Sequence, residues 1–235
     1  MAILPLGRAF TEAALRDPNR PAVTVGDVTY TRAQLESLAN RMARALQGHG
    51  VVQGSYVTIG LPNSPEFFAA TLAAWKLGAV PQPVSPRLPQ REREAIVDLA
   101  GSPVVLGAEP DEHTGRVCLP VGWMPDESID DSPLPDIIPP TWKAPTSGGS
   151  TGRPKLIVAG DPGVLDTEAD PGMGVQRDGV MLVPGPMYHN APFSYSTRGL
   201  VNGNHVVTMA RFDAEATLVA AQQHRPDWML LVPTM

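Results

Sequence analysis

The stretch that decides the fold is Tyr56–Ser85, "YVTIGLPNSPEFFAATLAAWKLGAVPQPVS". Its opening residues are β-branched and apolar, which predicts a short strand. Ser64 then offers a helix cap, Pro65 suits the first helical position, and Glu66 complements the positive end of the helix. Gly78 ends that helix, and a second strand interrupted by prolines follows. Strand, helix and strand in this order predict a βαβ unit with parallel strands and a right-handed crossover.

The same alternation continues on both sides of this unit. On the N-terminal side, Ala22–Tyr30, "AVTVGDVTY", alternates β-branched residues around a Gly-Asp pair, which is a hairpin signal. Thr31 and Gln34 then form a capping box ahead of a helix with one apolar face. On the C-terminal side, "PQREREAIVDLA" predicts a third helix and "PVVLG" a further strand. The sequence therefore predicts an α/β fold of βαβ units, with a mainly parallel sheet flanked by helices.

Composition restricts the partners that the chain is expected to have. With 43% hydrophobic and 18% charged residues, the 235-residue chain has the composition of a globular protein. A formal net charge of −6 without runs of Lys or Arg argues against nucleic acid as a partner. No stretch of about 18 apolar residues is present to span a membrane, and "MAILPLGRAF" lacks the pattern of a signal peptide, so we expect a cytoplasmic protein. The single cysteine, Cys118, has no partner for an intrachain disulfide.

A change of character divides the chain into three parts. Residues 108–145 are acidic and rich in proline, as in "DESIDDSPLPDIIPP", and have no visible period. We therefore expect an α/β subdomain over residues 1–107, a long surface connection over 108–145, and a second α/β subdomain beginning in 146–235. In this last part "DAEATLVAAQQH" predicts a helix, and four apolar segments predict strands: Leu156–Val158, Val180–Val183, Val206–Met209 and Met229–Val232.

A glycine-rich loop opens the last part, within Ala144–Val158, "APTSGGSTGRPKLIV". Glycines let backbone N–H groups approach an anion, hydroxyl groups add donors, and a lysine adds positive charge, so the composition suits a polyphosphate. An ordinary turn between two elements would have a similar composition. A Walker-type loop is excluded because Lys155 is preceded by Pro154 and followed by Leu156.

A serine hydrolase is the main alternative from pattern alone. Gly148–Gly152 fits Gly-x-Ser-x-Gly with Ser150 as nucleophile, and Asp166 or Asp178 and then His189 follow in the order of an α/β-hydrolase triad. The context argues against it, because a nucleophile elbow joins a strand to a helix whereas Arg-Pro follows this loop. A structural module without chemistry is the other alternative.

The loop also resembles a specific family motif. Ser147–Lys155, "SGGSTGRPK", matches the phosphate-loop signature (S/T)-(S/G)-G-(S/T)-T-G-x-P-K of the adenylate-forming enzymes, which include acyl-CoA synthetases, aryl-CoA ligases, luciferases and peptide-synthetase adenylation domains. The usual glycine after the lysine is Leu156 here. The resemblance runs from about Thr29 to the last residue, interrupted by the acidic connection over 108–145, which has no family signature. It includes "NSPEF", "PMYHNAPF", "ARFDAEATL" and "PDWMLLVPTM". The chain is thus similar to the N-terminal portion of the large domain of such an enzyme.

This resemblance implies a reaction and a set of site residues. In the family, a carboxylate attacks the α-phosphate of Mg-ATP to give an acyl adenylate and pyrophosphate, and the thiol of coenzyme A then displaces AMP. The phosphate-binding residues would be Ser147, Gly148, Gly149, Ser150, Thr151, Gly152 and Lys155. His189 would border the acyl carboxylate as the catalytic residue, and an apolar acyl channel would be lined by Met187, Tyr188, Phe193 and Tyr195, for which a local core cluster is the alternative.

The resemblance also implies what the chain would lack. The motif forms resemble acyl-CoA or bile-acid-type CoA ligases, whose adenine-binding segment, Mg²⁺-binding Thr-Glu pair and C-terminal domain have no counterpart in this sequence. We therefore expect an N-terminal fragment of an acid–CoA ligase that uses ATP, Mg²⁺ and coenzyme A when whole, is inactive alone, and contributes no metal ligand. Apolar surface left uncovered would be exposed or would lead to self-association as a homo-oligomer.

Overall fold

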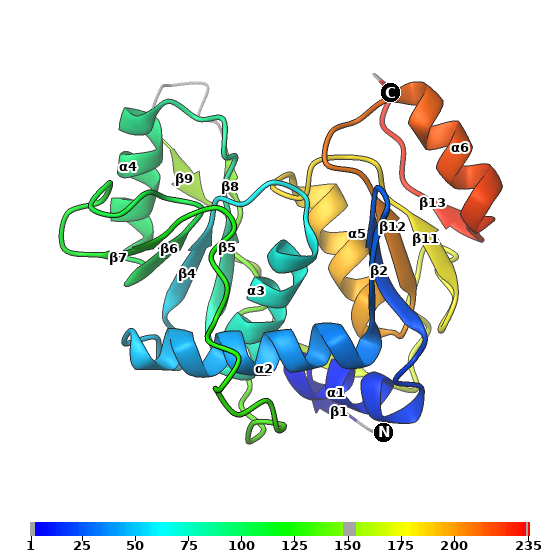
Figure 1. Ribbon diagram of the computed structural model, residues 1–235, viewed down its shortest axis with the longest axis horizontal. Helices are drawn as coiled ribbons and strands as arrows, with labels where there is room; N and C mark the ends of the chain where they lie inside the picture. The colour runs from blue at the N-terminus through cyan, green and yellow to red at the C-terminus, as the bar shows by residue number, and fades with distance from the viewer. Residues whose placement is uncertain (1–2, 148–153, 234) are drawn as a thin grey trace.

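The computed structural model describes residues 3–147, 154–233 and 235. Two mainly parallel β-sheets form its framework, with helices packed between and around them (Figure 1). The predicted α/β class with a mainly parallel sheet flanked by helices is therefore confirmed. Within the described residues, none of the helices has the length and apolar character needed to cross a membrane.

The four-stranded sheet is built around the βαβ unit predicted from the sequence. Its strand order is β5-β4-β6-β7, and every neighbouring pair is parallel. The crossover from β4 to β5 is helix α3, and helix α4 connects β5 to β6. The bounds are β4 Tyr56–Ile59, α3 Pro65–Lys76, β5 Val80–Pro83, α4 Gln90–Ala100, β6 Val104–Leu106 and β7 Val117–Leu119.

The five-stranded sheet joins the two ends of the chain. Its strand order is β13-β11-β12-β2-β3, and only the hairpin β2–β3 is antiparallel. Strand β12 pairs in parallel with β2, which places Val206 opposite Val23. Helix α5 lies between β11 and β12 in the chain, and helix α6 between β12 and β13. The bounds are β2 Pro21–Val25, β3 Val28–Thr31, β11 Val180–Leu182, α5 Asn190–Val201, β12 His205–Thr208, α6 Ala214–His224 and β13 Trp228–Met229.

Two small antiparallel pairs complete the strands. One joins β1 near the N-terminus to β10, and the other is the hairpin of β8 and β9 at the glycine-rich loop. Helices α1 and α2 pack beside α3 and complete the core. The bounds are β1 Ile3–Pro5, α1 Leu6–Arg16, α2 Arg32–Gly48, β8 Thr146–Ser147, β9 Lys155–Leu156 and β10 Val164–Asp166.

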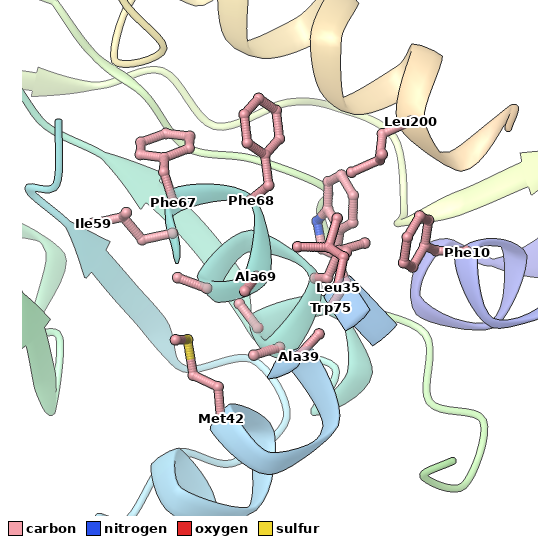
Figure 2. Packing of buried hydrophobic residues seen from close by; sticks show 14 of the residues in the cluster. Phe10, Leu35, Ala39, Met42, Ile59, Phe67, Phe68, Ala69, Trp75 and Leu200 are labelled. Atoms are coloured by element: carbon pink, nitrogen blue, oxygen red, sulfur yellow. The ribbon is translucent and has the colours of Figure 1, made fainter. Parts of the chain in front are cut away.

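Helix α3 is the centre of the hydrophobic core. It contacts strands of both sheets as well as α1 and α2, and all its residues except Glu66 are buried. Figure 2 shows its aromatic side chains among residues from α1, α2, β4 and α5, namely Phe10, Leu35, Ile59 and Leu200. Full burial stabilises each large apolar side chain by roughly 1.5–3 kcal/mol. This helix therefore fixes the position of one sheet relative to the other.

The predicted helix starts and the predicted hairpin are confirmed. The Thr31 hydroxyl accepts the N–H of Gln34, whose side chain in turn accepts the N–H of Thr31, so the capping box is complete. The Ser64 hydroxyl accepts the N–H of Phe67, and proline occupies the first position of α3. Gly26 has φ +58° in the turn between β2 and β3, a conformation that glycine adopts without strain.

Some elements differ from the sequence-based prediction. Helices α1 and α5 and strand β7 were not predicted, and β7 lies inside residues 108–145, where no period is visible. Its three residues are too few to show a period, and its pairing with β6 is what makes it a strand. The strand predicted at Leu156–Val158 is instead Lys155–Leu156, and the side chains of Ile157 and Val158 that follow it are exposed.

The acidic connection is held against α2 by its charges. Arg44 forms an ion pair with Asp130 at 2.8 Å and Arg41 one with Asp131 at 3.1 Å, while the Asn40 amide donates to the backbone oxygen of Asp131. Exposed ion pairs contribute little stability individually, but these fix the course of the segment. The boundaries predicted at 1–107, 108–145 and 146–235 stay a prediction, and both sheets contain strands from more than one of these parts.

Candidate functional site

The glycine-rich loop is closed at its base by a β-hairpin. Strands β8 and β9 pair with Ser147 opposite Lys155, and the hairpin continues through an N–H···O bond of 2.8 Å from Ile157 to Pro145. Lys155 is exposed. The other predicted phosphate-binding residues, Gly148, Gly149, Ser150, Thr151 and Gly152, lie outside the described residues. The structure thus brings together the first and last residues of the predicted site.

A buried amide attaches this hairpin to the four-stranded sheet. Gln82 of β5 is fully buried, and its Nε2 donates to the Thr146 hydroxyl of β8 at 3.0 Å. Its Oε1 accepts a hydrogen bond of 2.6 Å from the Thr58 hydroxyl of β4. A buried polar side chain needs such partners, so the three residues fix the hairpin beside β5. Sequence reasoning missed Gln82, whose only signal is a polar residue within an otherwise apolar strand.

His189 lies where a parallel strand gives way to a helix. It follows β11 and is the residue that precedes the first turn of α5, with an exposed side chain. Its ring is 4.5 Å from that of Tyr188, centroid to centroid. The N-terminus of α5 adds a partial positive charge next to it. This placement at the carboxyl end of a parallel strand is where open α/β sheets bind ligands, but the role of His189 stays a prediction.

Asn63 holds the loop that carries His189. Its Nδ2 donates to the backbone oxygens of Gly185 and Met209, both at 3.0 Å, and its Oδ1 accepts the N–H of Met187 at 2.8 Å. The side chain is buried and lies directly before the cap of α3. One amide therefore ties together the loops after β4, β11 and β12. Sequence reasoning placed Asn63 in the "NSPEF" motif but assigned it no role.

The four residues predicted to line an acyl channel do not share one wall. Met187 and Phe193 are fully buried in the core, where the Phe193 ring contacts the rings of Phe67 and Trp142. The local core cluster, the alternative to the channel, therefore describes these two. Tyr195 instead lines a cavity of about 370 Å³ beside α5, and Tyr188 contacts His189.

The residues proposed for a hydrolase triad have other partners. The Asp178 carboxylate pairs with Arg16 at 2.8 Å and with Arg32 at 2.6 Å, and Asp166 accepts backbone N–H groups of its own turn. Strand β9, not a helix, follows the loop that contains Ser150. Within 3–147, 154–233 and 235, no three His, Cys, Asp or Glu residues are arranged to hold a metal ion.

A solved structure of similar fold is that of a Coenzyme A Synthetase. The chain superimposes with a TM-score of 0.84 and 23% identity on the O-succinylbenzoate Coenzyme A Synthetase (MenE) from Bacillus subtilis in complex with AMP, covering 100% of this chain and 63% of that one. At this identity the likeness concerns the fold alone.

Sequence relatives and a family match extend this finding. The chain is 29% identical to 4-coumarate–CoA ligase 5 of Oryza sativa subsp. japonica, over 87% of this chain and 42% of that enzyme. It is 26% identical to Protein Y of Streptomyces griseus, over 98% of this chain and 85% of that protein. The chain thus spans less than half of the rice ligase but most of Protein Y. The family described as AMP-binding enzyme matches residues 10–235. With a match over nearly its whole length, this chain belongs to the AMP-binding enzyme family.

Proposed function

We propose that this chain is the nucleotide-phosphate-binding part of an acid–CoA ligase. The observation that carries the proposal is the β8–β9 hairpin, which pairs Ser147 with Lys155 and so closes the loop that contains the phosphate signature. A loop fixed at its base can present backbone N–H groups, hydroxyl groups and an ammonium group to one anion. Membership of the AMP-binding enzyme family and ligase relatives support the same reading.

In the proposed reaction, a carboxylate attacks the α-phosphate of Mg-ATP to form an acyl adenylate with release of pyrophosphate. The thiol of coenzyme A then forms the thioester and releases AMP. The charge that moves between phosphate oxygens calls for fixed donors and cations, not for a protein nucleophile. Lys155 and the loop N–H groups would hold the β- and γ-phosphates, and His189 would border the carboxylate.

Binding and turnover are separate parts of the proposal. We propose that these 235 residues bind Mg-ATP but do not complete adenylation alone, because the chain spans 42% of the rice ligase. Pyrophosphate release, measured with ATP and a panel of aromatic and fatty acids, tests turnover. Robust release by this polypeptide would contradict the second part and leave the first intact.

The direct test of binding is calorimetry with Mg-ATP on the wild type, Lys155→Met and Arg211→Met. Arg211 is exposed and lies far along the chain from the loop. Arg211→Met is therefore the control variant, because it also removes one positive charge. We expect Lys155→Met to weaken binding tenfold or more, since a hydrogen bond to a charged group contributes roughly 1.5–3 kcal/mol. Equal affinity of Lys155→Met and the wild type would refute the assignment. Labelling of Ser150 by a fluorophosphonate probe, without Mg-ATP binding, would instead support the hydrolase.

A further inference from the structure

A cavity of about 370 Å³ runs along one side of α5. This volume lies in the range of small-molecule pockets. One wall is formed by Trp142 and Lys143, which lie shortly before β8 in the chain, and another by the segment around Met173. The α5 residues that line the cavity are Asn190, Ala191, Ser194, Tyr195, Arg198 and Gly199. The cavity thus begins one residue after His189 and follows the helix away from it.

Two cations that line this cavity lie over one indole ring. The Lys143 Nζ is 4.2 Å from the centroid of the Trp142 ring, and the Arg198 guanidinium carbon is 5.6 Å from it. Nζ donates to the Asn190 side-chain oxygen at 2.6 Å and also contacts the Ser194 hydroxyl. Among the residues that the structure describes, no carboxylate forms an ion pair with either cation.

The electrostatics of the pair favour an anion. Partial burial, together with the charge of Arg198, lowers the pKa of Lys143 to about 8. Lys143 is partly buried and Arg198 is exposed, so a bound anion would offset the desolvation of the Lys143 ammonium group and its repulsion from the Arg198 guanidinium group. The hydrogen bonds to Asn190 and Ser194 orient the ammonium group but carry no negative charge.

The rest of the wall is mostly apolar and also includes Asn202. The Trp142 ring stacks on the buried Phe193 ring, and the Trp142 backbone oxygen accepts the indole N–H of Trp75 at 2.8 Å. Val175 and Tyr195 contribute further apolar surface. Flat aromatic surface beside two cations suits a ligand with an apolar or aromatic body and an acidic group.

We propose that this cavity binds an organic acid with a second anionic group, and that Lys143 and Arg198 hold the group that does not react. With a rise of 1.5 Å per residue, Arg198 lies about 13 Å along α5 from His189, so a small aromatic or aliphatic body fits between the two ends. One part of the proposal rests on the proposed function, namely that the acid bound in the cavity is the acid that is activated. Binding in the cavity itself needs no ATP.

The test compares terephthalate with its monomethyl ester, which has the same ring and one carboxylate fewer. Calorimetry at pH 7 without nucleotide is expected to show at least tenfold tighter binding of terephthalate by the wild type. Lys143→Met combined with Arg198→Met should bind both compounds equally, whereas Lys143→Arg should keep the preference. Arg91→Met, an exposed charge on α4, is the matched control and should behave as the wild type.

Three results would overturn the proposal: equal binding of both compounds by the wild type, binding of neither, or a preference that survives in the double variant. Circular dichroism of each variant confirms that it is folded. Mg-ATP titrations of the same proteins separate this proposal from the proposed function. A terephthalate preference without Mg-ATP binding would leave the cavity assignment standing and refute the nucleotide site, and the opposite result would do the reverse.

Discussion

Replacement of Glu36 by leucine should be among the most destabilising changes in the core. Glu36 of α2 and Lys76 of α3 form a buried ion pair with an Nζ–Oε1 distance of 2.8 Å. Nζ also donates to the Thr11 hydroxyl of α1 at 2.8 Å, so the pair joins three helices. Burial lowers the pKa of Lys76, and the attraction of Glu36 opposes that shift.

The expected loss of unfolding free energy follows from the buried, unpaired ammonium group of Lys76 that Glu36→Leu leaves. Breaking a buried ion pair by removing one partner costs about 3–5 kcal/mol in unfolding free energy. This loss of unfolding free energy has an upper limit, because Lys76 can release its proton and become neutral. Neutralising an ordinary lysine at pH 7 costs about 4.6 kcal/mol, and this cost falls by about 1.4 kcal/mol for each pH unit. Once Lys76 is neutral in the folded variant, the variant should therefore gain relative stability as pH rises.

Urea unfolding followed by circular dichroism measures these free energies at pH 7 and pH 9. The set consists of the wild type, Glu36→Leu, Lys76→Met and the double variant. The double variant should lie within about 1–2 kcal/mol of the wild type, since an apolar pair of similar volume replaces both charges. A loss below about 1 kcal/mol for Glu36→Leu would refute the reasoning. So would a double variant as unstable as the single one.

Three further predictions concern other sites. Gly203 has φ +84°, and a Cβ added there would lie 2.3 Å from Asp178 Oδ1, whereas Gly101 has φ +63° and nothing within 4 Å of an added Cβ. Gly203→Ala should therefore lower the urea midpoint of unfolding more than Gly101→Ala does. Equal losses in the two variants would contradict this. Burial lowers the pKa of His205 to about 4, so stability should be complete above pH 6.5 and fall towards pH 4 by at most about 3 kcal/mol. His205→Gln should abolish that slope in urea titrations. Because the pKa of Lys143 is about 8, the terephthalate preference measured by calorimetry should shrink between pH 7 and pH 9.5; an unchanged preference would contradict this.

Local signals explain which helices could be predicted from the sequence. The capping box at Thr31 and the Ser64 cap with its following proline use side chains within three residues of each other, so they are visible in the sequence. Helix α5, "NAPFSYSTRGLV", contains Pro, Gly and several hydroxyl residues, which have weak helix propensity. Its Ser196 and Thr197 hydroxyls bond back to backbone oxygens four residues earlier, and burial of Phe193 and Leu200 holds the helix. Tertiary contact therefore decides this helix.

The candidate site also contains residues that local sequence signals predicted and residues that they did not. The phosphate signature is a contiguous motif, and it predicted Ser147 and Lys155 as neighbours in one site, which the hairpin register is consistent with. Gln82 contacts a residue that is 64 positions away in the chain, and Asn63 one that is 124 positions away. No local sequence spacing predicts such contacts. The cation pair at Trp142 likewise depends on a helix that the sequence did not predict.

The strands of the five-stranded sheet are synthesised far apart in time, because β2 and β3 lie near the start of the chain and β11, β12 and β13 follow residue 179. The strands of the other sheet are all made by residue 119, so that sheet and its crossover helices can assemble early. The β2–β3 hairpin, although made first, has no parallel neighbour until β12 is complete at residue 208. An isolated hairpin is marginal in water, so during synthesis this hairpin keeps an unpaired edge until residue 208 has been made. Its exposure to chaperones and to wrong partners is therefore set by the time needed to make residues 32–208.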